Sequence, residues 1–147
     1  MKKLFLFFVA LTALAWALWP AKSGAQESGY VVIVNSSNAT STLTRDQVSD
    51  FLLKKKGKWQ SGSAVKPADL DSQSPVRAAM SKAIHGRSVA SIKNYWQRQI
   101  FSGRDVPPPE MPSDARMVAF VAGSPGGIGY VSSGARLNGV KAVEISE

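Results

Sequence analysis

One segment constrains the fold more than any other part of the chain: residues 113–134, SDARMVAFVAGSPGGIGYVSSG. Ser113 is a residue type that caps helix starts, and apolar residues then recur at helical spacing. This apolar face consists of Met117, Val118, Phe120 and Val121. Gly126 and Gly127 predict a chain reversal through positive φ, and Gly129 within the following apolar strand allows close backbone approach. A helix, a glycine turn and a buried strand in this order predict an α/β fold.

Three further strands are predicted. Residues 30–34 are continuously apolar and β-branched, which predicts a central strand covered on both faces, as is typical of parallel sheets. Residues 64–70 predict a short strand near an edge, because Pro67 cannot donate a backbone hydrogen bond. Residues 140–145 predict the last strand.

Helix starts are marked by capping residues. Thr44 and Gln47 form a capping box before a helix that we expect to end near Lys55. Ser74 and Pro75 predict a second helix, through residue 83, which Gly86 closes. A third helix begins near Ser88. Its expected core stripe is Val89, Ile92, Trp96 and Ile100.

The N-terminus resembles a secretory signal. Lys2 and Lys3 precede an apolar run over residues 4–19, and a small-residue site ends at Ala25. We expect residues 1–25 to be a cleaved leader, which would leave 26–147 as one exported, periplasmic domain. The alternative is retention of the run as an anchor, although it is shorter than the about 20 residues that span a bilayer.

Composition excludes several classes of function. Without the three lysines before Gln26 the formal net charge falls from +8 to +5, so the exported part is still basic and favours anionic ligands or partners, while export argues against nucleic acid. The absence of Cys excludes disulfides and thiolate metal sites.

The single histidine, His85, is expected at a helix C-terminus, which favours its cation. No metal, cofactor or nucleophile motif is present, so we expect no enzyme.

Polar residues follow three of the predicted strands and form a candidate anion site. Ser36 and Ser37 follow the first strand, Ser72 and Ser74 follow residues 64–70, and a further serine pair follows residues 128–131. If these strands are parallel, their exits converge at one edge of the sheet, where ligands bind in open α/β folds. Ser74 also lies at a helix start, and Arg77 in its first turn would add charged donors.

Each of these residues also has a purely structural interpretation. Serines commonly terminate strands and cap helices, and Arg77 could lie on a solvated helix face. The lysine run at residues 54–58 could contact anionic lipid or a partner, or could be solvated at a helix end. Trp59 and Trp96 are expected to pack in the core rather than to bind a ligand.

The order of these motifs resembles a known family. The landmarks are YVVIVN (30–35), LTRDQV (43–48), a basic turn ending at Trp59, SPVRAAMSKAIHG (74–86), a helix with Tyr95 and Trp96, and the SDA and GGIGYVS elements. Together they resemble the phosphate-binding component of bacterial ABC transporters. The resemblance implies a single lobe of a type II periplasmic-binding-protein-like fold, with a mixed or mostly parallel sheet flanked by helices.

The chain departs from this family at the implied phosphate site. Where phosphate-binding relatives carry Ser-Gly-Thr at a helix start, this chain has Ser74-Pro75-Val76, which removes one hydroxyl and one backbone donor. Asp69 and Asp71 lie where the relatives have an arginine. Two functions therefore stay open: an exported, non-catalytic protein that binds phosphate or another oxyanion, or an interaction or sensor-accessory module without a small ligand. The second would contact an envelope protein or another copy of the chain.

Overall fold

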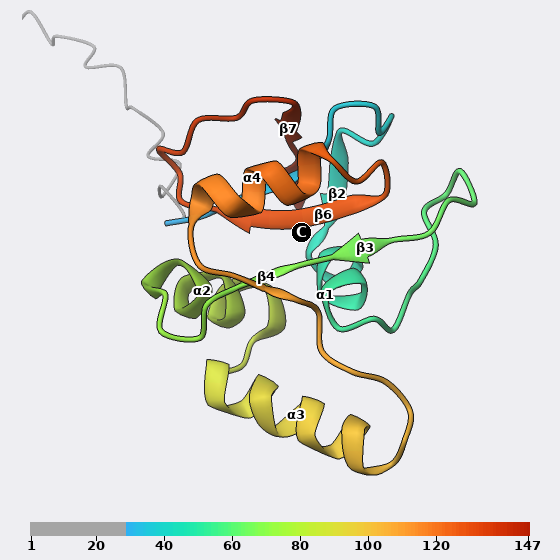
Figure 1. The fold of residues 1–147 in the computed structure, drawn as a ribbon, viewed down its shortest axis with the longest axis vertical. Coiled ribbons are helices and arrows are strands. Elements are labelled where there is room, and N and C mark those ends of the chain that lie inside the picture. The colour runs from blue at the N-terminus through green and yellow to red at the C-terminus, as the bar shows by residue number, and fades with distance from the viewer. Residues whose placement is uncertain (1–28) are drawn as a thin grey trace, which may run out of the picture.

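The computed structural model describes residues 29–147, and the predicted leader lies outside them (Figure 1). The elements in chain order are β1 (Val31–Asn35), β2 (Thr42–Thr44), α1 (Arg45–Leu52), β3 (Lys66–Pro67), β4 (Asp69–Leu70), α2 (Pro75–Met80), the π-helical turn η1 (Ser81–His85), α3 (Val89–Phe101), β5 (Glu110–Met111), α4 (Asp114–Ala122), β6 (Gly127–Val131), β7 (Val140–Ala142) and β8 (Glu144–Ser146).

The central sheet has four strands in the order β3-β6-β1-β7. β1 pairs antiparallel with both β6 and β7, whereas β3 pairs parallel with β6. Two small parallel sheets, β2-β8 and β4-β5, lie beside it. The expected α/β lobe with a mixed sheet is confirmed, and β1 is central as predicted. The expectation of parallel pairing for β1 was wrong, because a strand buried on both faces is equally compatible with antiparallel neighbours.

Capping residues start the helices where the sequence predicts. Thr44 and Gln47 form the full capping box at α1, and the serine before each of α2, α3 and α4 accepts a hydrogen bond from the backbone N–H three residues later. Gly86 ends the α2–η1 helix with a φ of 64°, a conformation that glycine adopts without steric cost. Local chemistry therefore determines these helix boundaries.

The main core lies between the sheet and its helices. Ile33 and Val34 of β1 and Ile128 and Tyr130 of β6 are fully buried, and Met117 of α4 packs onto β6. Figure 1 shows α4 lying along β6 and α3 set apart from the sheet, beyond α2. A separate small cluster supports α3 and consists of Leu53, Ile92 and Trp96, with Tyr95 against it.

Two sequence predictions need correction at the edges of this core. Ile100 was expected in the stripe of α3, but it is 51% exposed because α3 extends past the cluster that supports it. The expected C-terminal strand is divided into β7 and β8. Val143, between them, donates its N–H to Val32 of β1, while β8 pairs with β2.

The two glycines at the start of β6 are required by the space available to them rather than by their backbone angles. Gly126 and Gly127 do not have positive φ, contrary to the sequence prediction. A Cβ on Gly126 would lie 1.9 Å from the backbone oxygen of Ala64. At Gly129 the close approach is confirmed, because a Cβ there would lie 2.3 Å from Met117 Sδ.

We therefore expect Gly126→Ala to lower the free energy of unfolding by about 3 kcal/mol, because a rigid backbone oxygen would have to move. The measurement is urea denaturation followed by circular dichroism. Gly134→Ala is the matched control, since a Cβ there meets nothing within 4 Å. Equal stability of the two variants would contradict the close packing at Gly126.

Candidate functional site

The predicted site residues separate into two groups. Ser36 and Ser37 follow β1, whereas Ser72 and Ser74 follow β4. β1 runs antiparallel to β6, whereas β3 runs parallel to β6. The C-terminal end of β1 therefore lies at the opposite end of the sheet from the C-terminal ends of β3 and β6. The expected convergence of all three strand exits was therefore wrong. Ligand contact by these residues stays a prediction.

The β1 exit is organised by a buried asparagine. Asn35 Nδ2 donates to the backbone oxygens of Val121 and Ala122, which are carbonyls at the C-terminal end of α4. Its Oδ1 accepts from the N–H and the hydroxyl of Ser37. Ser36 donates its N–H to Gly139. These bonds close the turn after β1 and satisfy the end of α4.

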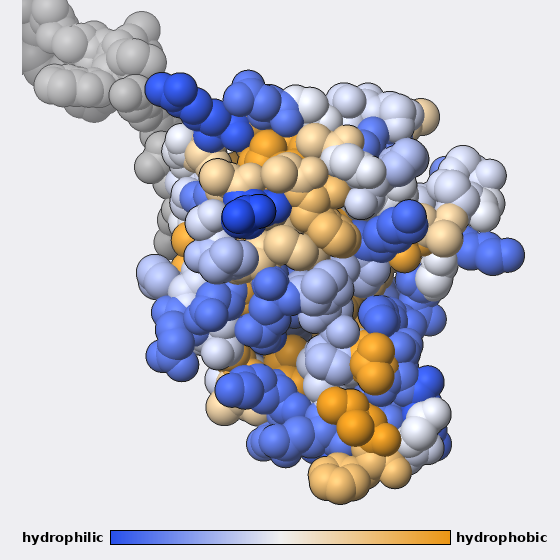
Figure 2. Space-filling model, in the orientation of Figure 1, coloured by the Kyte–Doolittle hydropathy of each residue, from blue (hydrophilic) through white to orange (hydrophobic). Residues whose placement is uncertain are grey.

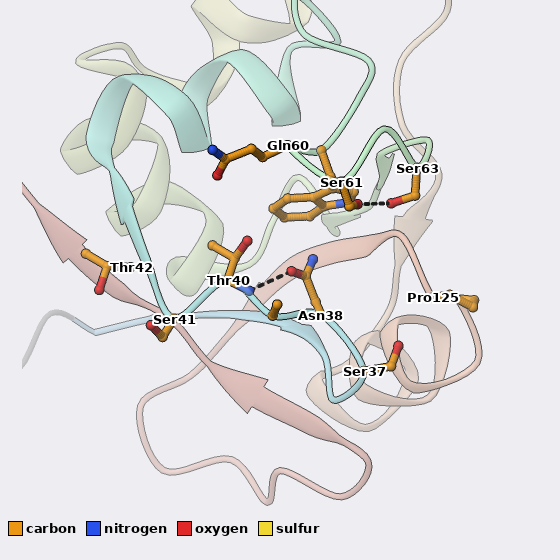
Figure 3. A pocket seen from close by; sticks show the side chains of 11 residues that line it. Ser37, Asn38, Thr40, Ser41, Thr42, Gln60, Ser61, Ser63 and Pro125 are labelled. Atoms are coloured by element: carbon orange, nitrogen blue, oxygen red, sulfur yellow. Dashed lines mark hydrogen bonds between the residues drawn. The ribbon is translucent and has the colours of Figure 1, made fainter.

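A pocket of about 680 Å³ adjoins this turn. Figure 3 shows Ser37, Asn38 and Thr40 on one side of it and Ser61 and Ser63 on another. Its lining is hydroxyl-rich and carries no charged side chain. The indole of Trp59, which also lines it, packs against Phe51 at 4.6 Å between ring centroids and donates to Gly126, as expected of a packing anchor.

Arg77 lies in the protein interior, where it binds other protein groups. It is 3% exposed, and its Nη1 donates to the backbone oxygen of Leu70 and to Glu110 Oε1, each at 2.7 Å. Its Nη2 lies 3.5 Å from Asp69 Oδ2. The guanidinium therefore joins α2 to β4 and β5. The solvated position considered for Arg77 was wrong, because Asp69 provides a buried partner.

Tyr130 completes this network from β6. Its hydroxyl donates to Asp69 Oδ1 at 2.5 Å and accepts the N–H of Leu70. Burial raises the pKa of Asp69, against the opposing effects of Arg77 and the Tyr130 hydrogen bond. Burial, together with the Asp69 carboxylate, raises the pKa of Tyr130, so the phenol stays protonated and acts as a donor.

Ser72 and Ser74 line a second pocket, of about 860 Å³, between the starts of α2 and α3. Lys82, Arg87 and Ser88 also line it, and no acidic side chain does. Within residues 29–147 neither Lys82 nor Arg87 has an ion-pair partner. The pocket therefore combines hydroxyl groups with two uncompensated positive charges.

Backbone donors also reach this pocket. The first N–H groups of a helix have no intrahelical acceptor, and in α3 these belong to Val89 and Ala90, both of which line the pocket. The helix dipole adds positive potential there. The Ser81 hydroxyl fixes the adjoining loop by donating to the backbone oxygen of Arg87 at 2.8 Å. Hydroxyls, N–H groups and cations in one concave site suit an oxyanion.

The sequence prediction did not include Lys82, Arg87 or Ser88 in this site. A signal was present, because Ser74 and Ser88 are both helix caps and the segment between them is basic. This pattern indicates a common site only if α3 folds back toward α2. Helical periodicity does not specify the angle between the two helices. Only the tertiary structure brings the two helix starts to one pocket.

His85 is half-buried next to this region and shares a hydrogen bond of 2.8 Å with Ser49 Oγ. Burial lowers its pKa to about 4, and Arg87, Lys55 and Arg77 act in the same direction. The expectation of a histidine cation was wrong, since desolvation and three neighbouring cations outweigh the helix dipole.

Within residues 29–147 no cluster of His, Cys, Asp and Glu has the arrangement of a metal site. In the same part of the chain, no helix has the length and apolar character needed to cross a bilayer.

We expect Arg77→Ala to lower the free energy of unfolding by about 3–5 kcal/mol, because Asp69 would be left buried without its cation. The double variant Arg77→Met with Asp69→Asn should recover part of this loss, since no charge then stays buried without a partner. Urea denaturation of the two variants measures the difference. If Arg77→Ala lowered the free energy of unfolding by less than about 1 kcal/mol, as is typical of an exposed ion pair, the buried network would be contradicted.

His85 should make stability depend on pH. As the pH falls from 6.5 toward 4, the unfolded chain binds a proton that the folded protein does not, so the free energy of unfolding should fall by up to about 3 kcal/mol. His85→Gln, which keeps a hydrogen-bonding side chain, should remove this part of the pH dependence. Parallel profiles for wild type and variant across this range would show that the imidazole is not desolvated.

No protein-family model matches the chain, and no curated protein matches it in sequence. Solved structures do match: a Clostridium perfringens phosphate ABC transporter substrate-binding protein with bound phosphate (TM-score 0.63, 18% identity), a Vibrio cholerae ABC-type phosphate transport receptor (0.61, 18%) and PstS from Borrelia burgdorferi (0.57, 15%).

These matches cover 80%, 80% and 81% of this chain, but only 44%, 46% and 47% of the respective solved chains. The chain thus spans less than half the length of the proteins it resembles, as expected for one lobe. At this identity the likeness concerns the fold alone. The predicted resemblance is confirmed at that level: the described residues have the fold of part of a phosphate-transport binding protein.

Proposed function

We propose that this protein binds phosphate or a related oxyanion reversibly and without catalysis, in the pocket between the starts of α2 and α3. The observation that carries the proposal is the lining of this pocket: Ser72, Ser74 and Ser88 with Lys82 and Arg87, and no acidic side chain. A phosphate dianion requires several donors and compensating charge, and this set supplies both. Export to the periplasm, where a solute-binding protein acts, belongs to the same proposal.

Known structures with this fold support the proposal. One of them, from Clostridium perfringens, is described with bound phosphate, and the one from Vibrio cholerae is described as a phosphate transport receptor. The proposed site keeps Ser72 and Ser74 from the site predicted from sequence and adds Lys82, Arg87 and Ser88. It does not include Ser36 and Ser37, which lie at the other end of the sheet. It also does not use Arg77, whose guanidinium bonds to Leu70 and Glu110.

Affinity should be low. Every residue that lines the pocket is half-buried or exposed, so a bound anion keeps part of its contact with water. Pro75 also leaves the start of α2 without one backbone donor. We therefore expect a dissociation constant of about 0.1–1 mM for the described lobe by itself, with tighter binding only if a second lobe or another copy closes the pocket.

The test is calorimetric titration of residues 26–147 with phosphate, with sulfate as the competing oxyanion. Lys82→Ala combined with Arg87→Ala should weaken binding at least about tenfold, because charged hydrogen bonds are lost. Ser72→Ala should weaken it less. Arg116→Ala combined with Arg136→Ala removes the same charge from exposed positions that do not line this pocket, and should leave the affinity unchanged.

The absence of saturable heat from phosphate and sulfate would refute the proposal, as would an equal loss in the control variant. The alternative function is an interaction or sensor-accessory module without a small ligand, for an envelope protein or another copy. The replacement of a donor by Pro75 favours it. Partner capture that is independent of phosphate, together with no heat, would establish that alternative.

A further inference from the structure

The end of α3 and the loop that follows it expose large apolar side chains. Phe101 is 91% exposed, and Ile100 and Val106 are 51% and 59% exposed. We call these three residues the apolar tip. Figure 2 shows hydrophobic residues gathered over this end of the molecule, with hydrophilic residues beside them. Burying an aromatic ring and two branched aliphatic side chains would be favourable, so a surface that exposes all three is a candidate for contact with another phase or molecule.

The lysine run at residues 54–58 is held beside this tip. The hydroxyl of Tyr95 donates to the backbone oxygen of Leu53, at the end of α1. Lys54 Nζ lies 3.3 Å from Asp105 Oδ1, and Asp105 directly precedes Val106. Two segments that are distant in sequence therefore meet at one end of the protein.

The two segments that meet at this end of the protein are mostly positive in charge. Residues 54–58 and 89–109 together carry seven Lys or Arg side chains and one acidic residue, Asp105. Asp105 is already paired with Lys54. We call five exposed cations of these two segments the basic collar. They are Lys55, Lys56, Lys58, Arg98 and Arg104.

The combination of exposed apolar side chains and positive charges indicates which kind of partner this surface would bind. A second copy of the chain docking through the same surface would bring two basic collars together, and like charges repel at such contacts. A neutral apolar partner would leave the collar without a role. A bilayer with anionic headgroups satisfies both parts, because apolar side chains enter its interfacial region while the cations stay among the headgroups.

We propose that the apolar tip and the basic collar dock the protein on the surface of a bilayer containing anionic lipid. Phe101, Ile100 and Val106 enter the headgroup and acyl boundary, and the collar provides the electrostatic attraction. Binding is peripheral and reversible, since three apolar side chains cannot anchor a protein permanently. The proposal does not depend on oxyanion binding in the pocket between α2 and α3.

The experiment uses residues 26–147, because the described residues bury a core of their own. Binding to vesicles of equal parts phosphatidylglycerol and phosphatidylcholine is measured by flotation, beside pure phosphatidylcholine vesicles. We expect binding to the anionic vesicles only, and a loss of binding as added salt screens the collar.

Two variants and two matched controls separate the contribution of the apolar tip from that of the basic collar. Ile100→Ser with Phe101→Ser should lower vesicle affinity at least about tenfold, whereas Leu137→Ser, another exposed apolar position, should not. Lys55→Glu with Lys56→Glu should lower it at least about tenfold, whereas Arg116→Glu with Arg136→Glu, with the same net charge, should have a smaller effect. Circular dichroism confirms that each variant is folded.

Headgroup phosphate in the α2–α3 pocket is a separate explanation, and the same assay distinguishes it. If it were correct, excess inorganic phosphate at matched ionic strength, or the Lys82→Ala and Arg87→Ala variant, would abolish vesicle binding, and the docking proposal would be overturned. No binding to anionic vesicles at low salt would also overturn it. So would dimerisation that Phe101→Ser removes without any vesicle binding.

Discussion

The buried network of Arg77, Asp69 and Tyr130 holds in place the end of this protein that carries the proposed pocket. Arg77 comes from the first turn of α2, Asp69 from β4 and Tyr130 from β6, so one network links a helix, a small sheet and the central sheet. Charges in a protein interior stay ionised only when partners compensate the loss of water. The network therefore constrains where α2 begins, and with it the positions of Ser72 and Ser74.

The same network explains why the most obvious cation of the sequence is not part of the proposed pocket. Arg77 lies in the first turn of α2, where a cationic side chain could reach an anion at the helix start. Its guanidinium is instead paired with Glu110 and Asp69. Positive charge at the pocket instead comes from Lys82 and Arg87, which have no acidic partner in residues 29–147. A cation supports ligand binding only where the fold leaves it uncompensated.

The two proposed binding surfaces use the basic character of the chain in different ways. In the pocket, cations act together with backbone N–H groups and hydroxyls on one small anion. At the end of α3, cations surround exposed apolar side chains and favour an extended anionic surface. Net charge alone does not distinguish these uses. What distinguishes them is the kind of group that each cation has beside it.

Local chemistry in the sequence determined the helix starts, the central position of β1, the buried face of α4 and the close packing at Gly129. Each of these depends on residues that are near one another in the chain or on simple apolar periodicity. Only the tertiary structure decided that β1 and β6 are antiparallel, which separates Ser37 from Ser74, and that α3 folds back to place Ser88 beside Ser74. Strand direction and the angle between helices depend on packing between distant segments, and no local pattern encodes them.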